Sequence, residues 1–229
     1  MNLEHKKQRV IVYVDGFNFY YGLRVGRWKK YYWIDIVKLF EQFTRPDQEL
    51  VAVKYFSARP TDEGKAKRQD SFFQANRENP KFKLFLGKYQ KKGIMCFNCK
   101  RVIHTYEEKE TDVRIATQVV FDACSGNNDI AIVVSADSDM IPAIELAMEA
   151  RCKVFVYFPP NQHSSNLATI GNNKPVMLSR YEPKFRRAIL PDVIPLKYSG
   201  FRLSIPDKWK ALQGPGATSP RPPRERAAD

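Results

Sequence analysis

Residues 10–18 read Val-Ile-Val-Tyr-Val-Asp-Gly-Phe-Asn, a run of five apolar residues that ends in a polar turn. A strand that is buried on both faces is apolar at every position, and such strands belong to parallel sheets. Comparable runs occur at residues 50–56, 82–89, 130–134 and 154–158. The sequence therefore predicts five strands of one buried sheet.

Segments with helical spacing of apolar residues lie between these runs, at residues 34–43, 62–79, 112–124 and 140–150. A lysine-rich stretch, residues 88–101, is expected to be a loop. Strands that alternate with helices indicate an α/β fold, with a mostly parallel sheet covered by helices on both sides.

The composition limits the class of protein. The chain has 229 residues, 43% of them hydrophobic, which is enough for one full-sized domain with extensions. No apolar run approaches the ~20 residues that span a bilayer, and we expect a cytoplasmic protein without a membrane partner. The formal net charge of +13 favours a polyanionic partner, with nucleic acid ahead of a membrane surface.

Aspartates follow two of the predicted strands. Asp15 ends the first, Asp137 and Asp139 follow residues 130–134, and Asp112 opens the helix that leads into that strand. Ligands of open α/β sheets bind beyond the carboxyl ends of the strands, so we expect these carboxylates at one edge. Such a group suits a hard divalent cation like Mg²⁺, which orients an attacking water and stabilises charge on a phosphodiester.

Each aspartate also has a simpler interpretation. Asp15 can form a turn with Gly16, and Asp139 can cap the helix that follows it. Asp137 can face solvent in a loop, and Asp112 can complement a helix dipole. These interpretations explain the acids separately but not their shared edge, so the sequence favours a metal site.

Three motifs resemble one known family. Residues 12–20 (Val-Tyr-Val-Asp-Gly-Phe-Asn-Phe-Tyr) resemble the opening strand and turn of NYN domains, the LabA-like branch of the PIN-like nucleases. Residues 108–113 (Glu-Lys-Glu-Thr-Asp-Val) resemble the start of their acidic helix. Residues 133–142 are similar to their Ser-Gly-Asp-Ser-Asp segment, with Ala136 in place of the usual glycine.

The resemblance implies a three-layer α/β/α sandwich of the PIN-like type and a ribonuclease that depends on Mg²⁺ or Mn²⁺. It implies that Asp15, Asp112, Asp137 and Asp139 are the catalytic, metal-binding carboxylates. Asn18 matches an asparagine of the family's turn and would hold a water or phosphate near the metal. The hydroxyls of Ser135 and Ser138 stand where they could support the carboxylates.

The end of the chain resembles, more loosely, a C-terminal extension of bacterial family members, at residues 185–192 and 205–209. We therefore expect a family domain over residues 1–175 and an extension packed on it over 176–212. Residues 213–229 are rich in Pro and Gly, which predicts a disordered tail.

The cysteines offer a second metal hypothesis. Cys96, Cys99 and His104 would supply three of the four ligands that a structural zinc needs, and no fourth ligand can be identified. Zinc is therefore disfavoured. We expect Cys124 and Cys152 to be buried packing thiols.

Basic and aromatic residues alternate in two stretches. The first contains Arg24, Arg27, Lys29 and Lys30 around the rings of residues 28 and 31–33, and the second contains Lys88, Lys91 and Lys92. Cations that contact phosphates and rings that stack on bases suit single-stranded RNA. The alternative, equally weighted, is that the rings pack in the core and the cations are solvated.

The predicted function is a Mg²⁺- or Mn²⁺-dependent endoribonuclease, whose partner is single-stranded or structured RNA. A water held at the aspartates would attack the phosphodiester in line, leaving a 5′-phosphate and a 3′-hydroxyl. Two alternatives stay open: a non-catalytic RNA-binding or regulatory module, and a DNA-directed PIN-like nuclease. The sequence identifies no protein partner and does not choose between a monomer and a homodimer.

Overall fold

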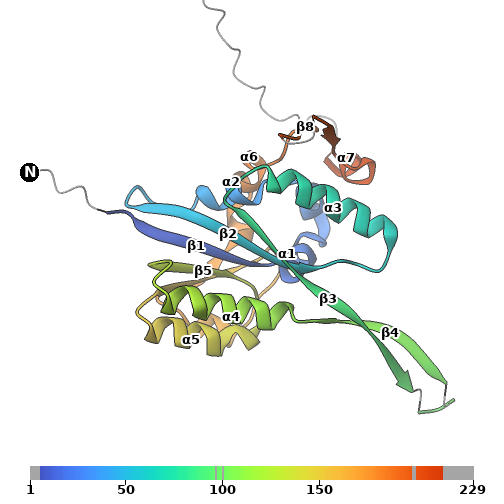
Figure 1. Cartoon of the computed structure of the whole chain (residues 1–229), viewed down its shortest axis with the longest axis horizontal. Coiled ribbons are helices and arrows are strands. Elements are labelled where there is room, and N and C mark those ends of the chain that lie inside the picture. The colour runs from blue at the N-terminus through green and yellow to red at the C-terminus, as the bar shows by residue number, and fades with distance from the viewer. Residues whose placement is uncertain (1–5, 96, 100, 198–199, 214–229) are drawn as a thin grey trace, which may run out of the picture.

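The computed structural model describes residues 6–95, 97–99, 101–197 and 200–213, and a seven-stranded sheet forms its centre (Figure 1). The strand order is β4-β3-β2-β1-β5-β6-β7, and every neighbouring pair is parallel except β3 and β4. Helices cover both faces of this sheet. The prediction of an α/β sandwich with a mostly parallel sheet is confirmed.

The strands of the main sheet are β1 (Gln8–Asp15), β2 (Gln48–Ala58), β3 (Phe82–Met95), β4 (Val102–Lys109), β5 (Ile130–Val134), β6 (Lys153–Phe158) and β7 (Val176–Met177). The strands β8 (Val193–Pro195) and β9 (Arg202–Ser204) form a separate antiparallel pair. The α-helices are α1 (Gly16–Leu23), α2 (Ile36–Glu41), α3 (Glu63–Arg77), α4 (Thr111–Cys124), α5 (Ile141–Glu149), α6 (Glu182–Arg187) and α7 (Asp207–Gln213). Short 3₁₀ helices are η1 (Gly26–Tyr31), η2 (Ser138–Met140), η3 (Leu167–Thr169) and η4 (Leu178–Tyr181). Among the residues that the structure describes, no helix is long and apolar enough to cross a membrane.

The continuous apolar run of β1 serves two separate cores. Val10, Val12 and Val14 face the core that α1, α2 and α3 cover. Ile11 and Tyr13 face the core on the other side, which α4 and α5 cover (Figure 1). Because successive side chains of a strand point to opposite faces, a central strand between two helical layers must be apolar throughout.

The lysine-rich stretch is a hairpin, which corrects the prediction of a loop over residues 88–101. β3 continues to Met95 and pairs with β4 in antiparallel register, from Lys88 opposite Lys109 to Met95 opposite Val102. Beyond Gly87 the pairing with β2 ends, so the hairpin projects from the sheet as an arm (Figure 1). Lysine has low strand propensity, and the cross-strand pairing overrides it.

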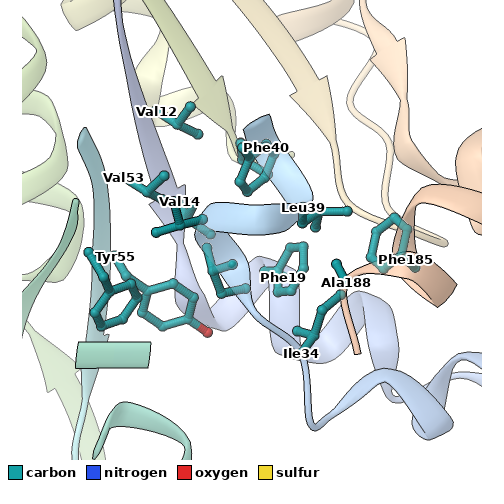
Figure 2. Packing of buried hydrophobic residues seen from close by; sticks show 14 of the residues in the cluster. Val12, Val14, Phe19, Ile34, Leu39, Phe40, Val53, Tyr55, Phe185 and Ala188 are labelled. Carbon is teal, nitrogen blue, oxygen red and sulfur yellow. The ribbon is translucent and has the colours of Figure 1, made fainter. Parts of the chain in front are cut away.

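Residues beyond 176 contribute to the main core. Phe185 is fully buried, and its ring packs against the rings of Phe19, Trp28 and Tyr31 at centroid distances of 6.2, 5.1 and 5.5 Å. Figure 2 shows Phe185 and Ala188 in the same cluster as Phe19. β7 also extends the main sheet after β6, which the sequence had indicated as the last strand.

Candidate functional site

The carboxyl edge of the sheet brings the four predicted aspartates into one region. β1 and β5 are parallel neighbours in the register Val14 opposite Val134, so the residues that follow both strands emerge side by side. Asp15 is the last residue of β1, and Asp137 and Asp139 lie just beyond β5. Asp112 lies in the first turn of α4.

Asp15 is the buried member of the group, with 2% of its surface exposed. It caps α1, because its Oδ1 accepts hydrogen bonds from the backbone N–H groups of Phe17 at 3.1 Å and Asn18 at 3.0 Å. Its Oδ2 accepts from Asn18 Nδ2 at 2.5 Å and Ser135 Oγ at 2.9 Å. Burial raises the pKa of Asp15 although these donors oppose the shift.

Ser135 connects Asp15 to the segment after β5. Its fully buried Oγ donates to Asp15 and accepts from the backbone N–H of Asp137 at 3.0 Å. Asp137 in turn caps η2, since its Oδ1 accepts from the N–H of Asp139 at 3.0 Å. The capping residue is thus Asp137, not Asp139, and Asp139 is exposed. The Ser138 hydroxyl makes no hydrogen bond to these carboxylates within the described residues.

The pKa of Asp112 shows that the other three aspartates act on it electrostatically. Its pKa is raised to about 6, first by desolvation and then by the charges of Asp15, Asp137 and Asp139. Like charges disfavour the ionised form, so these four carboxyl groups repel one another at neutral pH. This repulsion is what a bound cation would relieve.

Close packing of β3 against the start of α4 positions Asp112. A Cβ added at Gly87 would lie 2.6 Å from Thr111 Oγ1 and 2.7 Å from the carbonyl oxygen of Lys109. Only glycine therefore permits this approach. Glu110, whose φ is +79°, forms ion pairs with Lys88 at 2.7 Å and Arg114 at 3.0 Å. The predicted RNA contact Lys88 thus also anchors the start of α4.

The donor set of this edge fits Mg²⁺ or Mn²⁺. Its four side chains offer carboxylate oxygens, which hard divalent cations prefer. Among the described residues, no three His, Cys, Asp or Glu side chains converge into a ready-made metal-binding group. Mg²⁺ commonly keeps several waters and takes one or two carboxylates plus a substrate phosphate, so a preformed cage is not required.

Neutralising Asp112 is expected to stabilise the metal-free protein. The folded state holds the Asp112 proton up to about pH 6, whereas the unfolded chain releases it near pH 3.8. The free energy of unfolding should therefore fall as the pH rises through this window. Because the side chain is exposed and solvent screens its charge, the free energy of unfolding should change by only about 1 kcal/mol. In EDTA at pH 7, Asp112→Asn should raise Tm by about 2–4 °C.

The control for this measurement is Asp47→Asn, an exposed aspartate at the opposite edge of the sheet. Its Tm should match the wild type. Added Mg²⁺ should raise Tm of the wild type more than that of Asp112→Asn, because binding to the folded state stabilises it. A lower Tm for Asp112→Asn at pH 7 would contradict repulsion within the group.

The other predicted basic contacts separate into three pairs. Arg27 and Lys30 form ion pairs with Glu182 at 3.2 and 2.9 Å. Arg24 and Lys29 are exposed and line a pocket beside α1. Lys91 and Lys92 lie on the hairpin arm, where both side chains are exposed.

Most of the rings in the first basic stretch pack in the core, which was the alternative to base stacking. Trp28, Tyr31 and Trp33 are buried at 4%, 1% and 0% exposure. Tyr32 is half-buried and lines the pocket that Arg24 and Lys29 also line.

The cysteines are described only in part. Cys96 and the side chain of His104 lie outside the described residues, and Cys99 is a free, exposed thiol. Cys152 is buried, as expected. The prediction that Cys124 is a packing thiol is wrong, because this last residue of α4 is exposed.

Sequence reasoning missed the residues that form the pocket next to Asp15. Tyr55 of β2 and Gln69 of α3 line it, together with Gly16. The hydroxyl of Tyr55 lies 3.5 Å from the carbonyl oxygen of Gly16, the residue after Asp15, which places this ring close to the acidic edge. Burial and, after it, the charge of Asp15 raise the pKa of Tyr55. The strand and helix periodicities that marked these segments carry no signal for a shared pocket.

Comparisons with known proteins agree with this architecture. The family model of the NYN domain matches residues 9–170. A 6-hydroxy-3-succinoylpyridine 3-monooxygenase, HspA, of Pseudomonas putida is 28% identical over 180 residues, which is 63% of this chain. The chain spans only 57% of the length of that relative. A crystal structure of a protein of unknown function from Vibrio parahaemolyticus aligns with a TM-score of 0.53 at 23% identity, covering 77% of this chain and 96% of the other.

Proposed function

The chain belongs to the NYN domain family, and on this basis we propose that it is an endoribonuclease that depends on Mg²⁺ or Mn²⁺. The observation that supports the proposal is that Asp15, Asp137 and Asp139 follow the neighbouring parallel strands β1 and β5 at one edge of the sheet, where desolvation and then their charges raise the pKa of Asp112. This edge is where α/β sheets bind their ligands.

The chain's own residues would divide the work at this edge. Ser135 and Asn18 fix the orientation of Asp15 through hydrogen bonds of 2.9 and 2.5 Å. Asp137, Asp139 and Asp112 present further oxygens for a cation and for an attacking water. A bound Mg²⁺ or Mn²⁺ would lower the pKa of that water and offset the charge that develops on the phosphodiester. Cleavage would leave a 5′-phosphate and a 3′-hydroxyl.

The charge of the chain supports a polyanionic substrate. The formal net charge is +13, yet the proposed catalytic edge is acidic. A nucleic acid needs cations beside such an edge to hold its phosphates. Arg24 and Lys29 supply them close to α1, and Lys91 and Lys92 extend the basic surface along the hairpin.

A second candidate comes from the monooxygenase name of the Pseudomonas relative. The aromatic pocket beside Asp15 supports it, because a flat pyridine ring would fit there. Hydroxylation does not use four carboxylates at one edge, whereas phosphodiester hydrolysis does, so we rank the nuclease first. Oxygen uptake with a substituted pyridine and a reduced nicotinamide would be the sign of the second candidate.

Circular RNA without free ends gives the most direct test of the proposal. The full chain should convert it to linear products with 5′-phosphate ends in Mg²⁺ or Mn²⁺, and EDTA should stop the reaction. Circular single-stranded DNA of the same sequence separates the RNA-directed from the DNA-directed nuclease. Binding of RNA without cleavage in either metal would indicate the non-catalytic module, and full cleavage in EDTA would defeat the metal mechanism.

A further inference from the structure

A pocket of about 580 Å³ opens beside the acidic edge. Its walls come from α1, from the 3₁₀ helix η1, from β2 and α3, and from α7 near the end of the described chain. Figure 1 shows α1 and α3 on the same face of the sheet. The size is that of a site for a small organic group.

The rim of this pocket is positively charged. Five basic residues line it and no acidic residue does: Arg24, Lys29, Lys65, Arg68 and Lys208. None of these five forms an ion pair within the described residues. By contrast, Arg27 and Lys30 both form ion pairs with Glu182. A rim of unpaired cations without acids suits an anionic ligand, such as a phosphate.

The walls of the pocket are aromatic. Tyr20 stacks on Tyr32 with ring centroids 5.2 Å apart, and Tyr32 packs against Trp209 at 5.7 Å. Tyr21 also lines the pocket and keeps 48% of its surface exposed. An exposed ring beside unpaired cations is the arrangement on which an unstacked base can lie.

Gln69 adds an unpartnered polar atom to the wall. Its Nε2 donates to Ser57 Oγ at 3.1 Å and to the carbonyl oxygen of Ala58 at 3.2 Å. A carbonyl oxygen can only accept, so this contact sets which end of the amide is the nitrogen. The other end, Oε1, is buried and has no partner among the described residues. A ligand N–H group would satisfy this oxygen after a small shift of the Gln69 side chain, since the atom has almost no exposed surface now.

The pocket adjoins the proposed catalytic edge. Gly16, the residue after Asp15, lines it, and the hydroxyl of Tyr55 lies 3.5 Å from the carbonyl oxygen of Gly16. We infer that the pocket binds one unpaired nucleobase of an RNA strand, whose adjoining phosphates contact the basic rim. The substrate would then be single-stranded next to the cleaved bond. This inference rests on the proposed function for the identity of the ligand.

Binding in EDTA tests the inference apart from catalysis. The probes are a fluorescently labelled ten-nucleotide RNA of mixed sequence and its blunt duplex, measured by polarisation with the full chain. Single-stranded RNA should bind roughly tenfold more tightly than the duplex, because only an unpaired base can enter and stack. Lys65→Ala combined with Arg68→Ala should weaken single-strand binding roughly tenfold or more.

A matched control removes the same charge from the same helix. Lys67 and Arg77 are exposed on α3 and do not line the pocket, so changing both to Ala should weaken binding by less than about threefold. Tyr21→Ala should cost roughly fivefold or more through lost stacking. Phe121→Ala, an exposed ring on α4, should leave affinity unchanged.

Two results would overturn the inference. If the Lys65/Arg68 and Lys67/Arg77 double variants lost equal RNA affinity, the RNA would be attracted by net charge alone. Free nucleoside monophosphates that bind more tightly than the strand would make the pocket a small-molecule site. Failure of the nuclease proposal has a different signature: no cleavage in any metal, with the binding pattern intact. Where cleavage occurs, the pocket variants should raise KM and leave kcat within about twofold.

Discussion

Asp137→Asn is expected to lower RNA cleavage by about two to three orders of magnitude. Removing a carboxylate charge from the proposed metal edge costs several kcal/mol of transition-state stabilisation, and each 1.36 kcal/mol is about tenfold in rate. The change should leave the fold intact. The backbone N–H of Asp139 now donates a hydrogen bond to Asp137 Oδ1, and the side-chain oxygen of Asn can accept the same bond. Single-turnover cleavage of RNA in Mn²⁺ measures the effect.

Asp47→Asn is the matched control, since it makes the same chemical change at the far edge of the sheet. It should cleave as the wild type does. RNA affinity in EDTA and Tm of Asp137→Asn should stay close to wild type or rise slightly, because one repulsive charge is gone. Undiminished cleavage by Asp137→Asn would remove this residue from the proposed catalytic group.

Phe185→Ala is expected to destabilise the fold by about 3–5 kcal/mol, the range for emptying a buried aromatic site. The ring is fully buried, and it contacts rings from α1 and η1, which precede it by more than 150 residues. Tm should fall by roughly 10 °C at this chain length. Thermal and urea unfolding followed by far-UV circular dichroism would measure both quantities.

The control here is Phe121→Ala, where the same atoms are removed from an exposed position on α4. Its stability should change by less than about 0.5 kcal/mol. An equal loss of stability in the two variants would mean that the buried ring of Phe185 contributes no more to stability than an exposed ring does. Because the family model ends at residue 170, a large loss at Phe185 alone would show that the family segment needs the following residues for its core.

Much of the fold could be predicted from the sequence because its signals are local. The five apolar runs appear within β1, β2, β3, β5 and β6. A fully apolar run signals burial on both faces, and the structure explains it through two cores separated by β1. The shared edge of Asp15 and Asp137 follows from the same rule, since parallel neighbours end on the same side.

The hairpin and the aromatic stretch could not be predicted, because their structure depends on distant partners. Residues 88–95 have the composition of a loop, and only pairing with β4 makes them a strand. The sequence left open whether Trp28 and Tyr31 stack on bases or pack in the core, and the structure packs both against Phe185, more than 150 residues further along the chain. Glu182 likewise takes Arg27 and Lys30, about 150 residues away.

The sequence by itself determined the buried strands β1, β2, β3, β5 and β6, the helices between them and the edge at which the aspartates stand, since periodicity and chain direction are properties of neighbouring residues. Only the tertiary structure decided which basic side chains and aromatic rings remain free to contact a ligand. Unpaired charge and exposed ring surface depend on what packs against a side chain, and here Tyr32 meets Trp209 and Arg27 meets Glu182 across most of the chain.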